Sequence, residues 1–268
     1  MKDRALQLVR EATGVQKANV LREYLQAHIL YSLQSARAFE QLAFVGGIAL
    51  RFLYGLKRYS EDLDFSLERP EGYDFQSLTR QVVSDLTKAG FEVTQHPRSG
   101  KTVHSAYIRL PGLLYEAGLS PHPEEKLSIK IEIDTRPPAG AETETTVVNL
   151  HFLLALWHYD LPSLMAGKLH ALLSRSYTKG RDIYDLLWYL TQEVRPNTTL
   201  LNNALHQTGW DGPQVNSENW GTILKARLEA LEWEETVEDV AAFLEDPGER
   251  QLLTPDNIIS VLQRSAKR

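Results

Sequence analysis

The stretch FVGGIALRFLYGLKRYSEDLDFSLE, residues 44–68, decides how the first half of the chain folds. It starts as a short apolar run, turns at Gly46-Gly47, continues as an apolar segment up to Gly55, and ends in the alternating LDFSL. This order predicts a buried strand, a glycine turn, a short helix that stops at Gly55, and a second strand over 63–67.

Two acids lie beside or inside that second strand, although acids are poor strand residues and are costly to bury. Alternate residues of a strand share a face, with Cα atoms about 6.6 Å apart, so Asp62 and Asp64 can reach the same point. Oxygen ligands of this kind suit Mg²⁺ or Mn²⁺. A chance D-x-D is common and is usually a pair of solvated surface acids. We therefore interpret the pair together with its surroundings.

A further acid is offered by LSIKIEIDTRP, which alternates as a strand and places Glu132 and Asp134 on one face with Lys130. A third carboxylate from another strand would complete a two-metal site suited to phosphoryl transfer. Glu132 is the first candidate and Asp134 the alternative. Upstream, the glycine pair opens a helix, and backbone N–H groups at such a turn can approach a triphosphate.

These elements form a recognisable pattern. GGIALRFLYGLKRYSEDLDF resembles the glycine-to-D-x-D element of the nucleotidyltransferase superfamily, which includes DNA polymerase β. More narrowly, it is similar to the AbiEii/AbiGii toxin family, in which G-G-x-A-L…R-x-S-E-D-L-D-F recurs. The block KLHALLSRSYTKGRDIYDL, residues 168–186, resembles that family's second motif, K-x-x-A-L…R…K-x-R-D-x-x-D-L. After residue 190 the chain carries no motif of this family.

The second block lies on two predicted helices. Lys168 and Arg175 are two turns apart on the first, so both could face an anion, and Asp182 and Asp185 share a face of the next. By themselves these residues also fit a buried ion-pair network that joins the helices, and the two interpretations can coexist. The resemblance implies that Lys168 contacts nucleotide phosphates, and that one or both aspartates hold this lysine or act in catalysis.

Three polar residues of the turn before the D-x-D are further candidates. Ser60 lies two residues before Asp62, so it could bind a phosphate or be modified as a nucleophile, but an ordinary turn hydroxyl is the interpretation we favour. Lys57 and Arg58 could clamp a phosphate or the acceptor strand. A solvated basic turn explains the same two residues equally well.

The composition limits the partners. The net charge of −6 argues against a non-specific nucleic-acid coat but permits a local basic groove, for which Arg98 and Lys101 are one cluster. The absence of cysteine excludes disulfides and cysteine-ligated zinc. The N-terminus has no apolar signal-peptide core, and no run approaches the roughly 18 apolar residues of a membrane span. We expect a cytoplasmic protein with no membrane partner.

The pattern along the chain predicts an α+β protein: a nucleotidyltransferase-like mixed sheet flanked by helices, followed by an all-helical C-terminal part. Helices are predicted over 16–42 and 75–90, and strands in FEVTQHP, TVHSAYIRL and TTVVNLHF. The predicted domains are 1–155, with N-terminal helices, and 156–268, which carries the Lys168, Asp182 and Asp185 motif.

The resemblance implies a toxin of a toxin-antitoxin system, of a kind associated with phage defence, that transfers a nucleotide from an NTP and releases pyrophosphate. Asp62, Asp64 and Glu132 would bind Mg²⁺, and Glu132 would help to deprotonate the attacking hydroxyl. It also implies the tRNA 3′ end or another RNA as acceptor and a cognate antitoxin protein as partner. The alternatives are a small-molecule nucleotidyltransferase, a kinase-like phosphotransferase acting on a partner, and a degenerate protein that only binds.

Overall fold

The computed structural model describes residues 1–266, which divide into two compact units. Unit 1 contains 1–55, 59–137 and 144–158, and unit 2 contains 56–58, 138–143 and the chain from 159 onward. The short segment 56–58 therefore belongs to unit 2 although the chain on both sides of it belongs to unit 1. The sequence predicted two domains divided at residue 155. The two compact units do not test whether these are independent domains, so that division stays a prediction.

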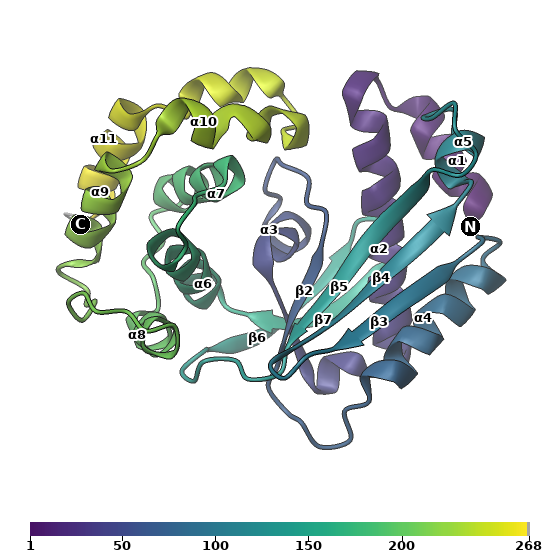
Figure 1. Cartoon of the computed structure of the whole chain (residues 1–268), viewed down its shortest axis with the longest axis horizontal. Helices are drawn as coiled ribbons and strands as arrows, with labels where there is room; N and C mark the ends of the chain where they lie inside the picture. The colour runs from purple at the N-terminus through teal and green to yellow at the C-terminus, as the bar shows by residue number, and fades with distance from the viewer. Residues whose placement is uncertain (267–268) are drawn as a thin grey trace. The chain divides into compact units, whose positions relative to one another are not determined.

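A seven-stranded mixed sheet is the main feature of unit 1 (Figure 1). Its order is β3-β4-β5-β2-β1-β7-β6. The strands are β1 (Leu42–Val45), β2 (Leu63–Leu67), β3 (Thr94–Ser99), β4 (Val103–Pro111), β5 (Lys126–Asp134), β6 (Thr143–Asn149) and β7 (Leu153–Tyr159). β2 runs antiparallel to β1 but parallel to β5, and β3, β4 and β5 alternate in direction.

Helices cover one face of this sheet. α1 (Lys2–Glu11) packs on α2 (Lys17–Ser35), and α2 packs on α4 (Phe75–Lys88) and on β5, while α4 also contacts β3 and β4. The covered face is apolar because every second residue of β4 and β5, such as Ile108 and Ile131, is buried. In Figure 1, α2 lies behind β3, β4 and β5, and the other face of these strands is turned to the viewer. A short helix, α5 (Leu113–Glu116), follows β4.

The segment that connects β1 to β2 follows the sequence prediction. α3 (Gly46–Tyr54) begins directly after β1 and packs against β1 and β2. It ends at Gly55, whose backbone is left-handed with φ of 69°, a conformation that glycine adopts without the steric cost of a side chain.

Unit 2 is built mainly from helices. They are α6 (Leu161–Ser174), α7 (Gly180–Thr191), α8 (Thr198–Gln207), α9 (Trp220–Glu229), α10 (Trp233–Glu238) and α11 (Pro255–Ala266), with short 3₁₀ turns between the last two. α6 contacts α7, α8 and α9, and α11 contacts α7 and α9. The side chain of Trp220, 2% exposed, lies in the interior of this bundle.

Two elements differ from the sequence prediction. The helix predicted over 16–42 ends at Ser35, because the chain turns at Arg37 with φ of 58° and then forms a short 3₁₀ turn and β1. β7 was not predicted. Its apolar run LLALWHY has no clear alternation, and such a run cannot be told from a buried helical segment by periodicity alone.

Candidate active site

Strand register brings two of the predicted catalytic acids together in unit 1. β2 and β5 are parallel neighbours, and Asp64 lies opposite Glu132. Asp134 lies opposite Ser66, two residues further along, and its Oδ1 accepts a hydrogen bond from the N–H of Arg136 at 2.9 Å. Because neighbouring strands are about 4.8 Å apart and the two residues are register partners, the side chains of Asp64 and Glu132 lie side by side on one face of the sheet. The neighbour of Asp64 is therefore Glu132, not the alternative Asp134.

The glycine turn lies directly against Asp64. Gly46 has φ of 79°, and a Cβ atom added to it would lie 2.4 Å from Oδ2 of Asp64. Val45, the residue before the helix, provides no side-chain cap for the first N–H groups of α3. Gly47, the second predicted residue of this turn, is buried in the first turn of α3. A strand carboxylate and the N-terminus of a helix thus meet at Gly46.

Lys130 is a residue of this site to which the sequence reasoning gave no role. Its ammonium forms an ion pair with the carboxylate of Glu132. Partial burial lowers the pKa of Lys130, but the hydrogen bond and charge of Glu132, followed by the charge of Asp62, outweigh this effect and raise the pKa above its usual value. The signal in the sequence was the K-x-E spacing in an alternating strand, which places both side chains on one face.

The donor atoms here suit a divalent cation. Asp62, Asp64 and Glu132 offer carboxylate oxygens, the ligands that Mg²⁺ prefers, and Glu132 already binds the ammonium of Lys130. Within residues 1–266, no group of three or more His, Asp or Glu side chains is close enough to hold a metal ion. The three acids are therefore chemically suitable but are not arranged as a complete site.

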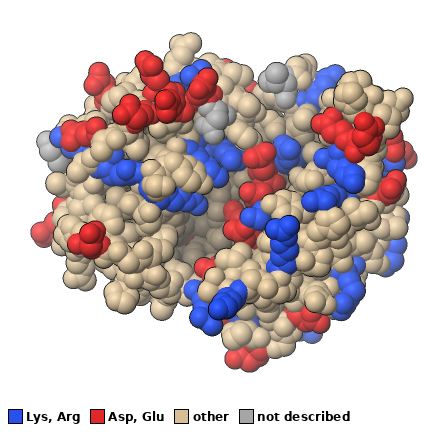
Figure 2. All heavy atoms as spheres, viewed as in Figure 1, with Lys and Arg blue, Asp and Glu red and all other residues tan. Residues whose placement is uncertain are grey.

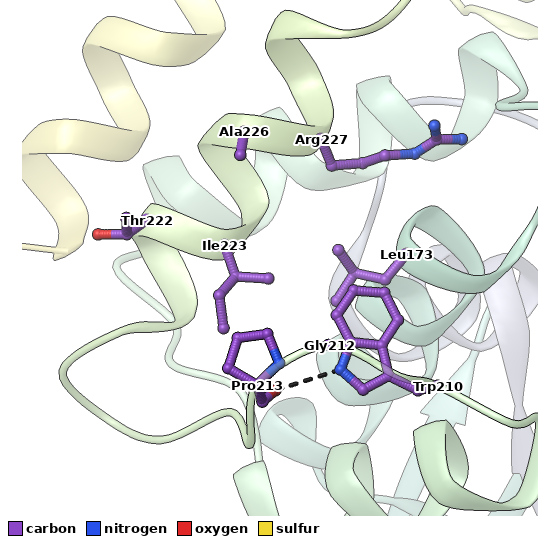
Figure 3. A pocket seen from close by; sticks show the side chains of 8 residues that line it. All are labelled: Leu173, Trp210, Gly212, Pro213, Thr222, Ile223, Ala226 and Arg227. Carbon is purple, nitrogen blue, oxygen red and sulfur yellow. Dashed lines mark hydrogen bonds between the residues drawn. The ribbon is translucent and has the colours of Figure 1, made fainter.

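The charges of this face are visible on the surface. Figure 2, which has the viewpoint of Figure 1, shows acidic side chains gathered over β2 and basic side chains beside them over β4 and β5. A second acidic patch covers α10, to which Glu234 and Glu235 contribute exposed carboxylates. The acids of unit 1 thus border a basic surface.

The second sequence motif forms a buried ion-pair network in unit 2. The ammonium of Lys168, on α6, lies 2.8 Å from Oδ1 of Asp182 and 2.8 Å from Oδ2 of Asp185, both on α7. These three side chains are 14%, 6% and 0% exposed. The network that the sequence offered as one interpretation is therefore present and joins the two helices. A contact of Lys168 with nucleotide phosphates stays a prediction.

Arg58 belongs to the same network, which the sequence did not indicate. Its Nε and Nη2 donate to Oδ1 and Oδ2 of Asp185 at 2.5 and 2.6 Å, a bidentate pair with Arg58 only 2% exposed. Of the two interpretations that the sequence left open for Arg58, the solvated basic turn is wrong. Its guanidinium faces Asp185, so we no longer propose it as a phosphate ligand. Its backbone forms an isolated bridge with Leu244.

The four charges of this cluster stabilise one another. Burial raises the pKa values of Asp182 and Asp185, but the nearby cations outweigh it, and both pKa values are lowered. Burial also lowers the pKa values of Lys168 and Arg58, and the two aspartates outweigh it, so that both are raised. Two cations and two anions thus remain charged, and together they hold segment 56–58 against α7.

The remaining candidates are dispersed. The side chain of Lys57 is exposed, while its carbonyl accepts a hydrogen bond from the N–H of Glu245 at 3.2 Å. Ser60 is 9% exposed, and its carbonyl accepts a hydrogen bond from Nε2 of Gln26. Arg175 is 45% exposed and lies 3.4 Å from Asp182. Their predicted roles toward a nucleotide stay predictions.

Comparisons with solved structures show the same fold. JHP933 from Helicobacter pylori aligns with a TM-score of 0.58 and 20% identity, covering 93% of this chain and 92% of that one. MenT4, a nucleotidyltransferase toxin from Mycobacterium tuberculosis H37Rv, aligns with a TM-score of 0.60 and 17% identity, covering 99% and 93%. A comparison with curated protein sequences finds no match.

The family is shown by the sequence itself. The family described as "Nucleotidyl transferase AbiEii toxin, Type IV TA system" matches residues 28–255, which include the glycine turn, the acids of β2 and β5, and the Lys168 block. The predicted α+β class with a nucleotidyltransferase-like sheet is likewise confirmed. The chain belongs to the AbiEii family of nucleotidyltransferase toxins of type IV toxin-antitoxin systems.

Proposed function

We propose that this protein transfers a nucleotide from an NTP to the 3′ end of an RNA, with tRNA as the expected acceptor. The observation that carries the proposal is the pairing of Asp64 with Glu132 on adjacent parallel strands, directly beside the glycine turn at Gly46. An anionic pair next to a helix N-terminus provides one location for a cation and one for phosphate oxygens. Family membership supports the same reaction class.

The candidate residues of unit 1 have distinct roles in this proposed reaction. Asp62, Asp64 and Glu132 would hold Mg²⁺ or Mn²⁺, which would supply positive charge to the triphosphate. Backbone N–H groups at Gly46 and Gly47 would bind triphosphate oxygens. The acceptor hydroxyl oxygen forms a bond to the α-phosphorus, the bond from that phosphorus to the bridging oxygen breaks, and pyrophosphate leaves. Glu132 accepts the proton of the hydroxyl. Positioning and electrostatics carry most of such catalysis.

Lys130 has to be considered in this scheme because it binds Glu132. Its ammonium offsets the negative charge of Glu132 and Asp62 and limits the positions that Glu132 can take. We propose that Lys130 orients Glu132 and does not itself contact the reacting atoms.

The partners follow from the family and remain part of the proposal. A cognate antitoxin would restrain the enzyme, and the reaction would take place in the cytoplasm, where NTPs and tRNA are available. Among residues 1–266 no helix has the length and apolar character needed to span a bilayer.

A labelling experiment tests the proposal. The purified protein is incubated with each α-³²P NTP in turn, with Mg²⁺ and total tRNA, and the products are separated by gel electrophoresis. We expect one or two of the nucleotides to label tRNA. Glu132→Gln should abolish the labelling, whereas Asp134→Asn should retain it, because Asp134 lies on the same strand but opposite Ser66.

Each other result has a definite meaning. Label on tRNA that survives Glu132→Gln and Asp64→Asn would exclude the proposed acids. No label on RNA would overturn the RNA acceptor. Label on an added small molecule or on a partner protein would then establish one of the alternative activities.

A further inference from the structure

The uncovered face of β3, β4 and β5 is mainly polar, with the exposed Val103 at one end of β4. The alternate residues that form it are all half-buried or exposed, and the polar ones are Thr94, His96, Arg98, Ser105, Tyr107, Arg109, Lys126, Ser128, Lys130, Glu132 and Asp134. The residues between them on β4 and β5 are buried under α2 and α4, with Ala106 and Ile129 fully buried. One half of the sheet thus has an apolar covered face and a polar open face.

Strand register places basic residues in line with the acids. Arg98 lies opposite Ser105, Ser105 opposite Glu132, and Glu132 opposite Asp64. Residues directly opposite one another share a sheet face, so all four side chains are on the open face. At about 4.8 Å per strand, the Cα of Arg98 lies roughly 10 Å from that of Glu132. The row runs from the sheet edge to the proposed catalytic acids.

The neighbouring row adds an aromatic ring. His96 lies opposite Tyr107, and Tyr107 lies opposite Lys130. The guanidinium carbon of Arg109 is 5.8 Å from the centre of the Tyr107 ring. The open face therefore combines a half-buried aromatic ring with two neighbouring cations, Lys130 and Arg109.

The β3 and β4 part of this surface is opposite in charge to the whole chain. Residues 93–115 contain no Asp or Glu, whereas the protein carries a net charge of −6. Arg98 and Lys101 are exposed, and neither forms an ion pair within the described part of the chain. Thr135 donates its N–H to the carbonyl of Thr102, which places Arg136 beside the Lys101 turn. Basic residues thus gather at this end of β3 and β4, where Asp134 of β5, opposite Val103, is the neighbouring acid.

We propose that the open face of β3, β4 and β5 binds the single-stranded 3′ end of the RNA acceptor. Tyr107 stacks on a base, while Arg98 and Arg109 contact phosphates. Basic residues interleaved with an aromatic platform are the chemistry that binds single strands without sequence preference. The register directs a strand bound there toward Asp64 and Glu132. This assignment rests on the proposed function, which supplies the RNA.

Binding is measured without catalysis, so that failure of this assignment can be told from failure of the proposed function. Fluorescence anisotropy follows a short 5′-labelled single-stranded RNA, in the absence of NTP and divalent metal, over a range of salt concentrations. Tyr107→Leu should weaken binding about 5- to 150-fold, the range found when one stacked base loses its aromatic partner, and Tyr107→Phe should restore it.

Charge variants provide an independent test. Arg98→Gln should reduce the slope of log K against log[salt] by about 0.7, the value for one lost phosphate contact with a single strand. The matched control is Arg80→Gln, an arginine that is also exposed and lies on α4, the helix that covers the opposite face. It should leave both affinity and slope unchanged.

The outcomes separate the two proposals. Equal losses in Arg98→Gln and Arg80→Gln, or wild-type binding in Tyr107→Leu and Arg98→Gln, would overturn the assignment of this face. If the wild-type protein bound no RNA at low salt, the assignment of this face to RNA would also be overturned. A protein would then be the remaining partner for this surface. RNA binding that depends on Tyr107 and Arg98, with no nucleotide transfer, would uphold the surface and refute only the proposed function.

Discussion

The substitution Gly46→Ala should disable the active site while leaving the fold intact. The new Cβ would lie 2.4 Å from Oδ2 of Asp64, whereas such atoms are essentially never closer than 3.0 Å, so the carboxylate must move by at least 0.6 Å. A misplacement of about 1 Å can lower a rate about 100-fold, and we expect a loss of about 10- to 100-fold in nucleotide transfer. The left-handed backbone adds about 1–2 kcal/mol of destabilisation.

Gly55→Ala is the matched control. Gly55 closes the same helix with φ of 69°, and an added Cβ there meets nothing within 4 Å. Both variants carry a similar backbone cost, but only the first displaces Asp64. The two are compared by urea denaturation, for the free energy of unfolding, and by the rate of NTP incorporation.

We expect similar losses of stability and a large difference in rate. Equal rates in the two variants would refute the reasoning, because the contact between the helix start and Asp64 would then have no role in catalysis. A large loss of rate in Gly55→Ala alone would refute it as well.

Three further predictions concern the buried cluster of unit 2. Asp185→Asn should lower the free energy of unfolding by about 3–5 kcal/mol in urea denaturation, because it leaves the buried charges of Arg58 and Lys168 without their shared partner; no measurable change would contradict the network. Arg175→Gln should lower the free energy of unfolding by less than about 1 kcal/mol, since the side chain of Arg175 is 45% exposed and lies 3.4 Å from Asp182. A loss of stability comparable to that of Asp185→Asn would contradict this prediction. The pKa values of Asp182 and Asp185 are lowered below the ordinary value of 3.8, so the unfolded chain takes up protons first as the pH falls. Their contribution to stability is present above pH 3.8 and is lost as the pH falls through the folded pKa values, so acid-induced unfolding should be shallower in Asp185→Asn than in the wild type.

Local patterns were enough for the elements around Gly46. The glycine pair, the stop at Gly55 and the alternation of LDFSL correspond to α3 and β2, because turn chemistry and side-chain period act over a few neighbouring residues. The face shared by Lys130 and Glu132 could be predicted for the same reason. The alternation in β5 could not show which residue faces Asp64, since periodicity specifies a face and not a register.

The sequence by itself determined the family and the reaction class that the family carries, and it supplied the acids that we propose for the site. Only the tertiary structure shows that Glu132, and not Asp134, lies opposite Asp64, because β2 and β5 pair across some 60 intervening residues through backbone hydrogen bonds that no local pattern encodes. The tertiary structure alone also shows that Arg58 is buried. Its partner Asp185 is 127 positions away, and a charged turn looks the same in sequence whether its partner is water or a carboxylate.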